Sequence, residues 1–503
     1  MGNNQIKIGA VLGYVNYAVK MAVQLLYVPI MLRILGQSEY GVYQLVASMI
    51  TYLSLLNFGF GGAYLRFYAQ HREDRKQEAS LNGTFLIVFV FFAFLAVIAG
   101  SIMTYNAEVL LGNKLKPSEL GLAKVLFAIL TVNMATTFPG SVFTSIISSR
   151  EKFLFLRLTE LVRSIISPFL IITMLLLGYG SIGMAIATTL IAIGADMINI
   201  WYVFVKLKAP FSLRYFDKNL VKEIGAFSFF IFLNSVIDQI NWNVDKYLLG
   251  RFVGAVAIAV YSVAAQINTI YIQISDMLAT VLAPKVNVIA AEESDPMPHL
   301  NKLFFQVGRL QSYIVYAVLF GFMIFGKEFI GYWAGPGYEL TYYVTLLLIV
   351  PVSIPLCQTL GVDIQRALDK HQYRSLVYAV VAIMNLLVSI PLTKRFGAVG
   401  AAAGTTISLL IGNGLIMNIL YEKMIGLKVI EFWKQIVKNL PAVMVPSMIV
   451  LVVRWFITKR SMLLFVAEGL LFIGVYVVSL YKIAMNQQEK TEVQRIIKKI
   501  KRT

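Results

Sequence analysis

The chain has 503 residues, a net charge of +18 and a mean hydropathy of +0.74. Hydrophobic residues make up 58% of it and charged residues 14%, too little charge to cover the surface of a soluble protein of this size. Many apolar runs reach the ~20 residues that span a bilayer, so we expect an all-α polytopic membrane protein. Lys and Arg gather in the segments predicted on one side of the membrane, which explains the positive charge without nucleic acid.

The apolar runs predict about fourteen transmembrane helices, beginning with 8–32 and 40–65 and ending with 436–457 and 461–483. An even number of spans puts both termini on one side, and the distribution of Lys and Arg places that side in the cytoplasm. The tail from Asn486 is polar and basic, so we expect an interfacial helix or a disordered arm against anionic lipid.

An internal repeat is visible in the sequence. Gly180-Ser-Ile-Gly183 and its following residues match Gly397-Ala-Val-Gly400 at an offset of 217. Leu35-Gly36 answers Leu249-Gly250 at an offset of 214, and Tyr43 answers Tyr261 at 218. The repeat predicts two pseudo-symmetric six-helix lobes, and the interface between them is the default site of a repeated transporter. The predicted divisions are a first lobe at 1–208, a second lobe at 209–425, two extra transmembrane helices at 426–485 and a basic cytoplasmic tail at 486–503.

A polar stripe crosses the first apolar run. Its members follow at spacings of four, four and three, so they share one helical face: Asn16, Lys20, Gln24 and Tyr27. A similar stripe recurs in the second half: Asn234, Asp238, Asn241 and Asp245. Such a face is costly against lipid and must look into protein or water. Lys20 lies roughly 18 Å into its span, near the membrane midplane, and we assign it to substrate binding.

Three further cations lie in predicted spans or, for Arg66, at the inner end of one: Arg66, Arg163 and Arg309. Arg66 and Arg309 could bind substrate or extend to the inner headgroups, and Arg163 could pair with Glu160, three residues away. Four acidic residues are candidates for ion coupling: Asp196, Asp238, Asp245 and Asp276. Asp238 occupies the repeat position of Lys20, and we infer that the two face each other as a salt bridge or a proton or cation switch. Asp245 is close to the outer end of its span and could be solvated.

The sequence lacks the motifs of an enzyme. Gly178-Tyr-Gly-Ser-Ile-Gly183 fits a dinucleotide fingerprint, but it lies where a tight turn joins two spans. Cys357 is the only cysteine, and the three histidines have no metal-ligand spacing. We find no clustered carboxylates in the outer segments and no nucleophile–base pair, so we expect neither an enzyme, nor a metal, nor a cofactor.

Several motifs resemble the polysaccharide-repeat-unit flippases, the family that handles O-antigen, capsule and exopolysaccharide. They belong to the multidrug/oligosaccharidyl-lipid/polysaccharide (MOP) exporter superfamily. The motifs are Pro29-Ile-Met-Leu-Arg33-Ile-Leu-Gly36, Glu39-Tyr-Gly41-Val-Tyr43, Asn57-Phe-Gly-Phe-Gly-Gly-Ala, Arg150-Glu-Lys-Phe and Phe396-Gly-Ala-Val-Gly400. The resemblance covers essentially the whole chain, and its motifs are typical of the fold and of the polysaccharide branch more than of one substrate.

The resemblance implies two six-helix lobes, alternating access, and transport of an undecaprenyl-diphosphate-linked oligosaccharide from the inner to the outer leaflet of a bacterial cytoplasmic membrane. It also implies coupling to an ion gradient, H⁺ or Na⁺, with Asp238 the best carrier. We expect a monomer, with other polysaccharide-assembly proteins as potential partners. A drug or organic-cation antiporter of the same fold is the alternative, although its site would be acidic and aromatic. A polysaccharide polymerase or ligase would need a longer outer loop.

Overall fold

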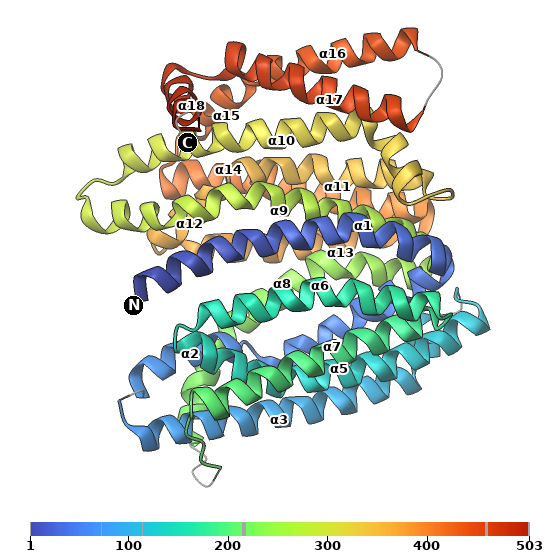
Figure 1. Cartoon of the computed structure of the whole chain (residues 1–503), viewed down its shortest axis with the longest axis vertical. Coiled ribbons are helices and arrows are strands. Elements are labelled where there is room, and N and C mark those ends of the chain that lie inside the picture. Colours follow the sequence, from blue (N-terminus) through green and yellow to red (C-terminus); the bar gives the residue numbers. More distant parts are fainter. Residues whose placement is uncertain (1, 72, 113, 214–217, 458–460, 501–503) are drawn as a thin grey trace. The chain divides into compact units, whose positions relative to one another are not determined.

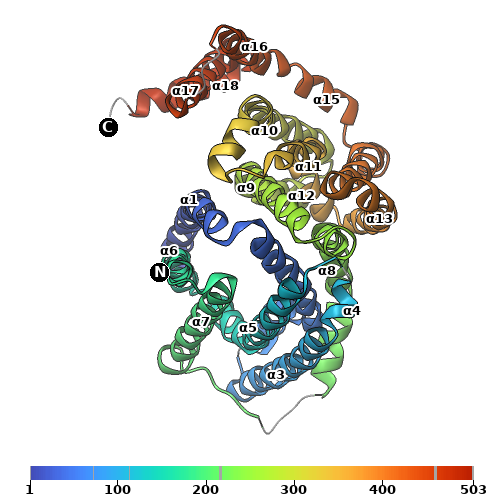
Figure 2. The ribbon, with the colours of Figure 1, turned by 90° about the vertical axis from the view of Figure 1, so that its right-hand side faces the viewer.

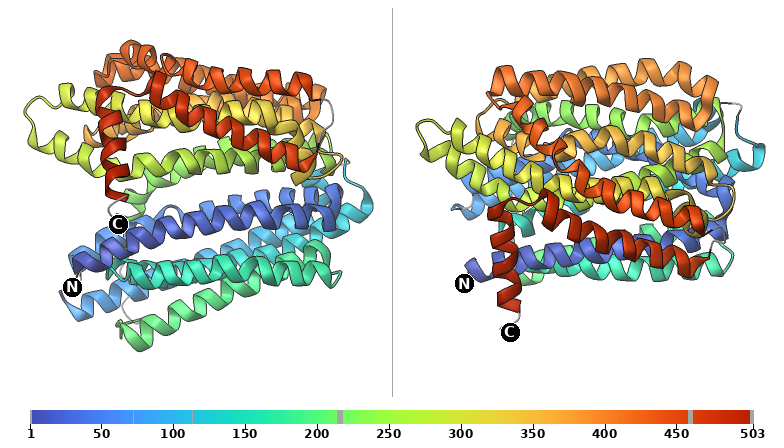
Figure 3. Two further views of the ribbon diagram at one scale, coloured as in Figure 1. Left: turned by 45° about the horizontal axis from the view of Figure 1, so that its top comes forward. Right: turned by 90° about the horizontal axis from the view of Figure 1, so that it is seen from above.

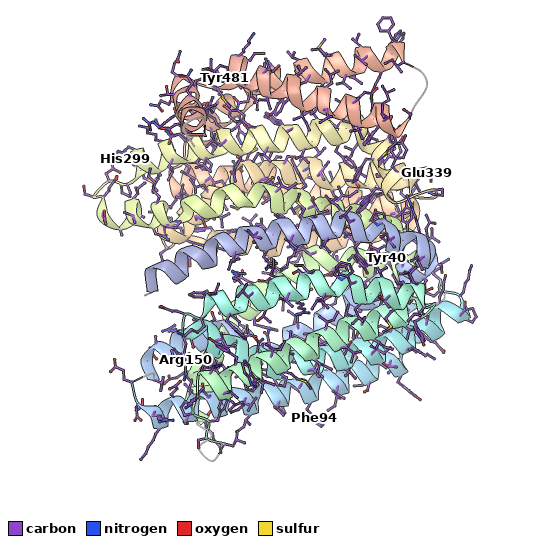
Figure 4. The ribbon with its side chains drawn as sticks, in the orientation of Figure 1. Tyr40, Phe94, Arg150, His299, Glu339 and Tyr481 are labelled. Carbon is purple, nitrogen blue, oxygen red and sulfur yellow. The ribbon has the colours of Figure 1, made fainter. Side chains whose placement is uncertain are left out.

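The computed structural model describes residues 2–71, 73–112, 114–213, 218–457 and 461–500. Within these residues the protein consists of helices joined by short connections and contains no strand, as the composition predicts (Figure 1). Large apolar side chains remain exposed along the helices, among them Phe94 on α3 at 61% exposure (Figure 4). An apolar exterior of this kind is suited to lipid rather than water.

The first half contains α1 (Gly2–Thr51), the 3₁₀ helix η1 (Tyr52–Asn57), α2 (Phe60–His71), α3 (Arg75–Tyr105), α4 (Ala107–Leu111), α5 (Pro117–Ser149), α6 (Phe153–Leu176), α7 (Gly180–Trp201), the π-helical η2 (Tyr202–Lys206) and α8 (Lys218–Phe252). The second half contains α9 (Ala255–Glu292), α10 (Met297–Trp333), α11 (Glu339–Cys357), α12 (Thr359–Ala367), α13 (His371–Leu409), η3 (Leu410–Ile416), α14 (Met417–Leu420), η4 (Tyr421–Ile425), α15 (Val429–Val437), α16 (Leu440–Phe456), α17 (Met462–Ser479), η5 (Leu480–Ala484) and α18 (Gln487–Ile500).

Eleven helices of the described residues are long and apolar enough to cross a membrane, and a bent pair within α8 would be a twelfth. Two of the eleven are about twice the usual length, Val15–His71 and Gln372–Ile425. Each contains a glycine outside helical geometry, Gly36 (φ 70°) and Gly397 (φ 59°). At 1.5 Å per residue, the 50-residue α1 would measure about 75 Å if straight, more than twice the ~30 Å hydrocarbon core. Two crossings for each long helix are compatible with the predicted fourteen.

The helices group into two compact units, Met1–Ser262 with Ser389–Ala401 and Val263–Val388 with Ala402–Thr503. The first unit therefore includes α8, which packs against α1 and α2. The two lobes predicted from the sequence repeat, with a boundary at 208, are defined by internal symmetry, whereas these two units are defined by compactness. The predicted lobes therefore stay a prediction.

In the first unit, α1, α3, α5, α6 and α7 lie side by side, as the view along the helices shows (Figure 2). A polar network fastens one end of this bundle. Arg150, at the end of α5 (Figure 4), pairs with Glu78 of α3 and donates to the carbonyl of Leu207 at 2.8 Å. Both charged side chains are largely buried, so each one provides the polar contact that water would otherwise make with the other. The Arg150-Glu-Lys-Phe motif thus contributes a structural contact.

In the second unit, a buried charge cluster fixes the two extra helices to α10. Arg454 of α16 donates to Glu468 of α17 at 2.8 Å and to Glu328 of α10 at 3.2 Å. Arg454 is 10% exposed and Glu468 only 3%. The Arg454 guanidinium also lies 4.5 Å from the centre of the Phe325 ring. Three helices therefore meet at one guanidinium.

The backbone gives the predicted repeat a precise register. Gly180 and Gly397, aligned at an offset of 217, both have a positive φ, 55° and 59°. Gly250, however, lies inside α8, whereas Gly254 has a φ of 128° and directly precedes α9, as Gly36 precedes the second part of α1. The conformations therefore favour an offset of 218 at this point, the same as between Tyr43 and Tyr261, over the predicted 214.

Candidate functional site

The polar stripe of α1 faces its neighbours α6 and α7. Asn16 is 2% exposed, and its side-chain oxygen accepts a hydrogen bond of 3.3 Å from Ser164 of α6. The Tyr27 hydroxyl lies 3.4 Å from the sulfur of Met184 on α7. Gln24, between them, is half-buried. The stripe thus looks into protein, as its cost against lipid predicts.

Lys20, at the centre of the stripe, pairs with Glu160 of α6. The other oxygen of the Glu160 carboxylate accepts a hydrogen bond of 2.9 Å from Arg157, one turn earlier on the same helix. The three side chains remain 44%, 35% and 45% exposed, respectively. One carboxylate therefore serves two cations, and the cluster keeps a net positive charge on membrane-spanning helices.

This cluster differs from the pairing expected for Glu160. The spacing allowed an ion pair with Arg163, but in the structure Glu160 forms ion pairs with Lys20 and Arg157. Arg163 is exposed and forms no hydrogen bond or ion pair with the described residues. Arg157 is the residue that the sequence interpretation overlooked, although it too lies three positions from Glu160. Spacing alone could not choose between these two arginines.

Asp196 lies on α7 within electrostatic reach of Arg163. Its carboxylate packs against Gly140 of α5 so closely that an added Cβ at Gly140 would lie 2.3 Å from it. A glycine at this position therefore creates the space for a half-buried carboxylate between two helices. Asp196 remains a candidate for ion coupling.

Arg309 has structural partners. Its guanidinium donates to the carbonyl of Ala484 at 2.8 Å and to both oxygens of Glu489 on α18 at 3.3 Å. Tyr313 adds a hydrogen bond to Glu489 at 3.0 Å. Arg309 is 12% exposed and Glu489 15%. These contacts favour a role in holding α18 over direct substrate binding. Arg66 is exposed on α2.

The second polar stripe follows α8. Asn234 and Asp238 are exposed, and Asn241 is half-buried. Asp245, which could have been solvated, is instead 2% exposed and accepts a hydrogen bond from Tyr261 of α9. That expectation was wrong because α9 covers this end of α8. That Lys20 and Asp238 face each other stays a prediction. Asp276 lies on α9, and its side chain is not among those that the structure describes.

A second intramembrane lysine escaped the sequence interpretation. Lys246 follows Asp245 on α8, is half-buried, and lies 3.4 Å from the side-chain oxygen of Gln44 on α1. The same Gln44 donates to the Tyr40 hydroxyl at 3.0 Å. A cation inside a span was itself the signal that could have found it.

The glycine-rich string Gly178–Gly183 is the predicted tight turn. Gly178 and Gly180 have φ values of 84° and 55°, which favour glycine. The backbone N–H of Ser181, in the first turn of α7, donates to the carboxylate of Glu39. The turn therefore receives an anionic group from its own chain, at a helix end where negative charge is stabilising.

Residues 9–287, more than half of the chain, match the family described as "Polysaccharide biosynthesis protein". The chain belongs to this family. A relative from Shigella flexneri, named "Putative O-antigen transporter", is 20% identical over 415 residues, which cover 81% of this chain and 96% of that protein. The family resemblance inferred from the sequence motifs is thereby confirmed.

Solved structures show the fold of this polysaccharide biosynthesis protein. A structure titled "Lipid II flippase MurJ, inward closed conformation" superposes with a TM-score of 0.72 at 18% identity and covers 94% of this chain and 97% of that chain. An inward-facing multidrug resistance MATE family transporter of the MOP superfamily superposes with a TM-score of 0.55 at 15% identity, covering 83% and 95%. The chain therefore shares the fold of these two structures, and the protein is a multi-pass membrane protein.

Proposed function

We propose that this protein is a flippase that carries undecaprenyl-diphosphate-linked oligosaccharide repeat units from the inner to the outer leaflet of a bacterial cytoplasmic membrane by alternating access. Membership of the polysaccharide biosynthesis family supports the class of substrate. The relative named as an O-antigen transporter, matched over nearly its whole length, supports transport rather than synthesis. Both termini lie in the cytoplasm, because the predicted inner segments carry most of the Lys and Arg.

The observation that carries the proposal is the Lys20–Glu160–Arg157 cluster. A diphosphate bears charge on two adjacent phosphates, and two cations on adjacent helices can each receive one of them. Arg163 lies exposed one turn further along α6 and extends the same positive region. On the same face of α1, Gln24 and Tyr27 are half-buried and suited to hydrogen-bond the attached sugars, whereas Asn16 is 2% exposed and contacts Ser164 instead.

In the absence of substrate, the Glu160 carboxylate binds both cations of the cluster. Because its carboxylate bonds to both Lys20 and Arg157, the diphosphate competes with it for the same donors. Displacement leaves Glu160 without its partners, and a carboxylate in that position is ready to accept a proton. This exchange links substrate binding to proton uptake. Asp238 remains the best separate carrier of H⁺ or Na⁺, with Asp196, Asp245 and Asp276 as further candidates.

A drug or organic-cation antiporter shares the fold, as the multidrug transporter structure illustrates. Its site would need uncompensated carboxylates and aromatic rings to attract a cation. At the cluster on α1 and α6 cations outnumber carboxylates, which disfavours an organic cation as the substrate.

The test is leaflet-to-leaflet movement of undecaprenyl-diphosphate oligosaccharide in proteoliposomes containing the purified protein. We expect movement with the wild-type protein and its loss with Lys20→Ala. Lys124→Ala is the matched control, because it breaks another Lys–Glu ion pair, the 2.8 Å contact with Glu108, outside the proposed site. Normal movement with Lys20→Ala would remove this residue from the mechanism. Absence of movement beside transport of a cationic dye would favour the antiporter.

A further inference from the structure

A pocket of about 560 Å³ lies in the second unit, where α10 begins. It is bounded by the first turns of α10, by α15 with the residues before it, and by Asn486 at the start of α18. Its volume falls in the range of small-ligand sites, roughly 300–1,000 Å³. The proposed transport reaction assigns no task to this pocket.

Four hydrogen-bond donors line the pocket without a strong partner among the described residues. The side chains of Lys302 and Gln306 on α10 and of Gln435 on α15 form no hydrogen bond or ion pair with the described residues. The ammonium of Lys428 has Glu431 as its single partner among the described residues, at 3.7 Å, and both side chains are more than half exposed. Arg309, in contrast, is fully engaged by Glu489 and Ala484. The available donors therefore suit an anionic group such as a phosphate.

The pocket also contains two exposed carboxylates, Asp295 and Glu431. Together with Lys302 and Lys428 they give it two available charges of each sign. A simple anion would bind the two lysines and leave the two carboxylates without a ligand group. A ligand that carries a phosphate and, a few atoms away, a primary ammonium would satisfy both halves, because an ammonium donates three hydrogen bonds to carboxylate oxygens.

The helices around the pocket indicate where in the membrane such a ligand lies. α15 packs Phe432 onto Phe304 of α10, with ring centres 4.3 Å apart, and leaves Ile430 and Val437 exposed at 60% and 54%. The final helix α18 runs crosswise to α17 (Figure 3). Its polar side chains lie near Tyr481 (Figure 4), whose hydroxyl accepts a hydrogen bond of 2.9 Å from Gln494. Short amphipathic helices at the end of a span are typical of the headgroup region.

We propose that this pocket binds the headgroup of a bilayer phosphatidylethanolamine. Lys302 and Lys428 hold its phosphate, Gln306 and Gln435 donate to the remaining phosphate oxygens, and Asp295 and Glu431 accept from its ammonium. The acyl chains follow the exposed apolar side of α15. The lipid thereby joins α10 to α15, the helix that connects the main bundle to the two extra helices. The proposal does not depend on the transported substrate.

The test uses the full-length protein in detergent. Native mass spectrometry counts bound lipid, and the unfolding midpoint is measured against added phosphatidylethanolamine, phosphatidylglycerol or phosphatidylcholine with the same acyl chains. We expect phosphatidylethanolamine to bind best, since phosphatidylglycerol lacks the ammonium and the quaternary ammonium of phosphatidylcholine cannot donate hydrogen bonds. The double variant Lys302→Gln/Lys428→Gln should raise the half-saturating concentration at least tenfold.

Lys434→Gln is the matched control, because Lys434 is an exposed lysine on α15 that does not line the pocket. It should bind phosphatidylethanolamine like the wild-type protein. Gln306→Glu changes an exposed side chain and places a negative charge beside the phosphate, so it provides the test should the double variant fail to fold. Equal losses in Lys434→Gln and the pocket variants would overturn the proposal. So would equal binding of the three lipids, or equal stabilisation by soluble glycerophosphoethanolamine, which would identify a soluble ligand.

Discussion

The ammonium of Lys20 on α1 pairs with the carboxylate of Glu160 on α6, across 140 positions of sequence. Because Glu160 also binds Arg157, neither cation of the cluster is left without a counter-charge inside the membrane-spanning bundle. The pair can be read as a structural link or as a substrate site occupied by an internal anion. These two readings predict opposite effects when the carboxylate is removed.

Glu160→Gln should strengthen diphosphate binding. The substitution removes the competing charge and leaves Lys20 and Arg157 available, so we expect the dissociation constant of undecaprenyl diphosphate to fall on the order of tenfold, the equivalent of one charge-assisted hydrogen bond. Binding to the detergent-solubilised protein measures this directly. In proteoliposomes, transport by the same variant should respond less to a proton gradient than transport by the wild-type protein, and any response that remains is assigned to Asp238.

The control is Arg157→Gln, which removes one of the two cations and should weaken binding instead. A merely structural carboxylate gives a different pattern, because its loss would disorder Lys20 and weaken binding in both variants. That result would assign Glu160 to positioning Lys20 rather than to exchange with the substrate.

Arg309→Leu should reduce stability more than it reduces transport. Its guanidinium joins α10 to α18 through Glu489, and both side chains are nearly buried. Loss of a hydrogen bond to a charged group costs about 1.5–3 kcal/mol, which should lower the free energy of unfolding and expose the tail to proteases. We expect Glu489→Leu to have the same effect and the double variant to cost less than the sum of the two, as measured by a double-mutant cycle.

Transport per folded molecule decides the role of Arg309. If Arg309→Leu folds and inserts normally but fails to move substrate, while Glu489→Leu transports, Arg309 belongs to the substrate site after all. Equal transport by both variants supports the structural assignment.

The sequence predicted the helices and the polar face of α1 well, because span length and side-chain spacing depend on local chain geometry. It could not predict partners, because these depend on which helices become neighbours. Glu160 has an arginine three positions away on either side, yet its partner on another helix is Lys20. Asp245 lies near the end of its span, but α9 buries it.

Arg454→Met should destabilise the attachment of the two extra helices. Removal of the guanidinium takes a hydrogen-bonded counter-charge from Glu468, which is 3% exposed, and breaking a buried ion pair in this way costs about 3–5 kcal/mol. The unfolding midpoint in detergent should fall accordingly. Arg454→Met/Glu468→Met should recover much of the loss, because it removes both buried charges together. A double variant as unstable as the single one would show that packing, rather than charge, dominates at this position.

Gly41→Ala tests the close approach of α1 to the start of α9. A Cβ at Gly41 would lie 1.9 Å from the carbonyl oxygen of Ala255, so the backbone of one helix must move. Such overpacking typically costs about 1–3 kcal/mol. Gly194→Ala, within α7, is the matched control because no atom lies within 4 Å of its added Cβ. Alanine is the better helix former by about 1 kcal/mol, so this control should be neutral or stabilising. Comparison of the two unfolding midpoints therefore separates the steric contact from the general effect of glycine, and equal midpoints would contradict the packing of α1 against α9.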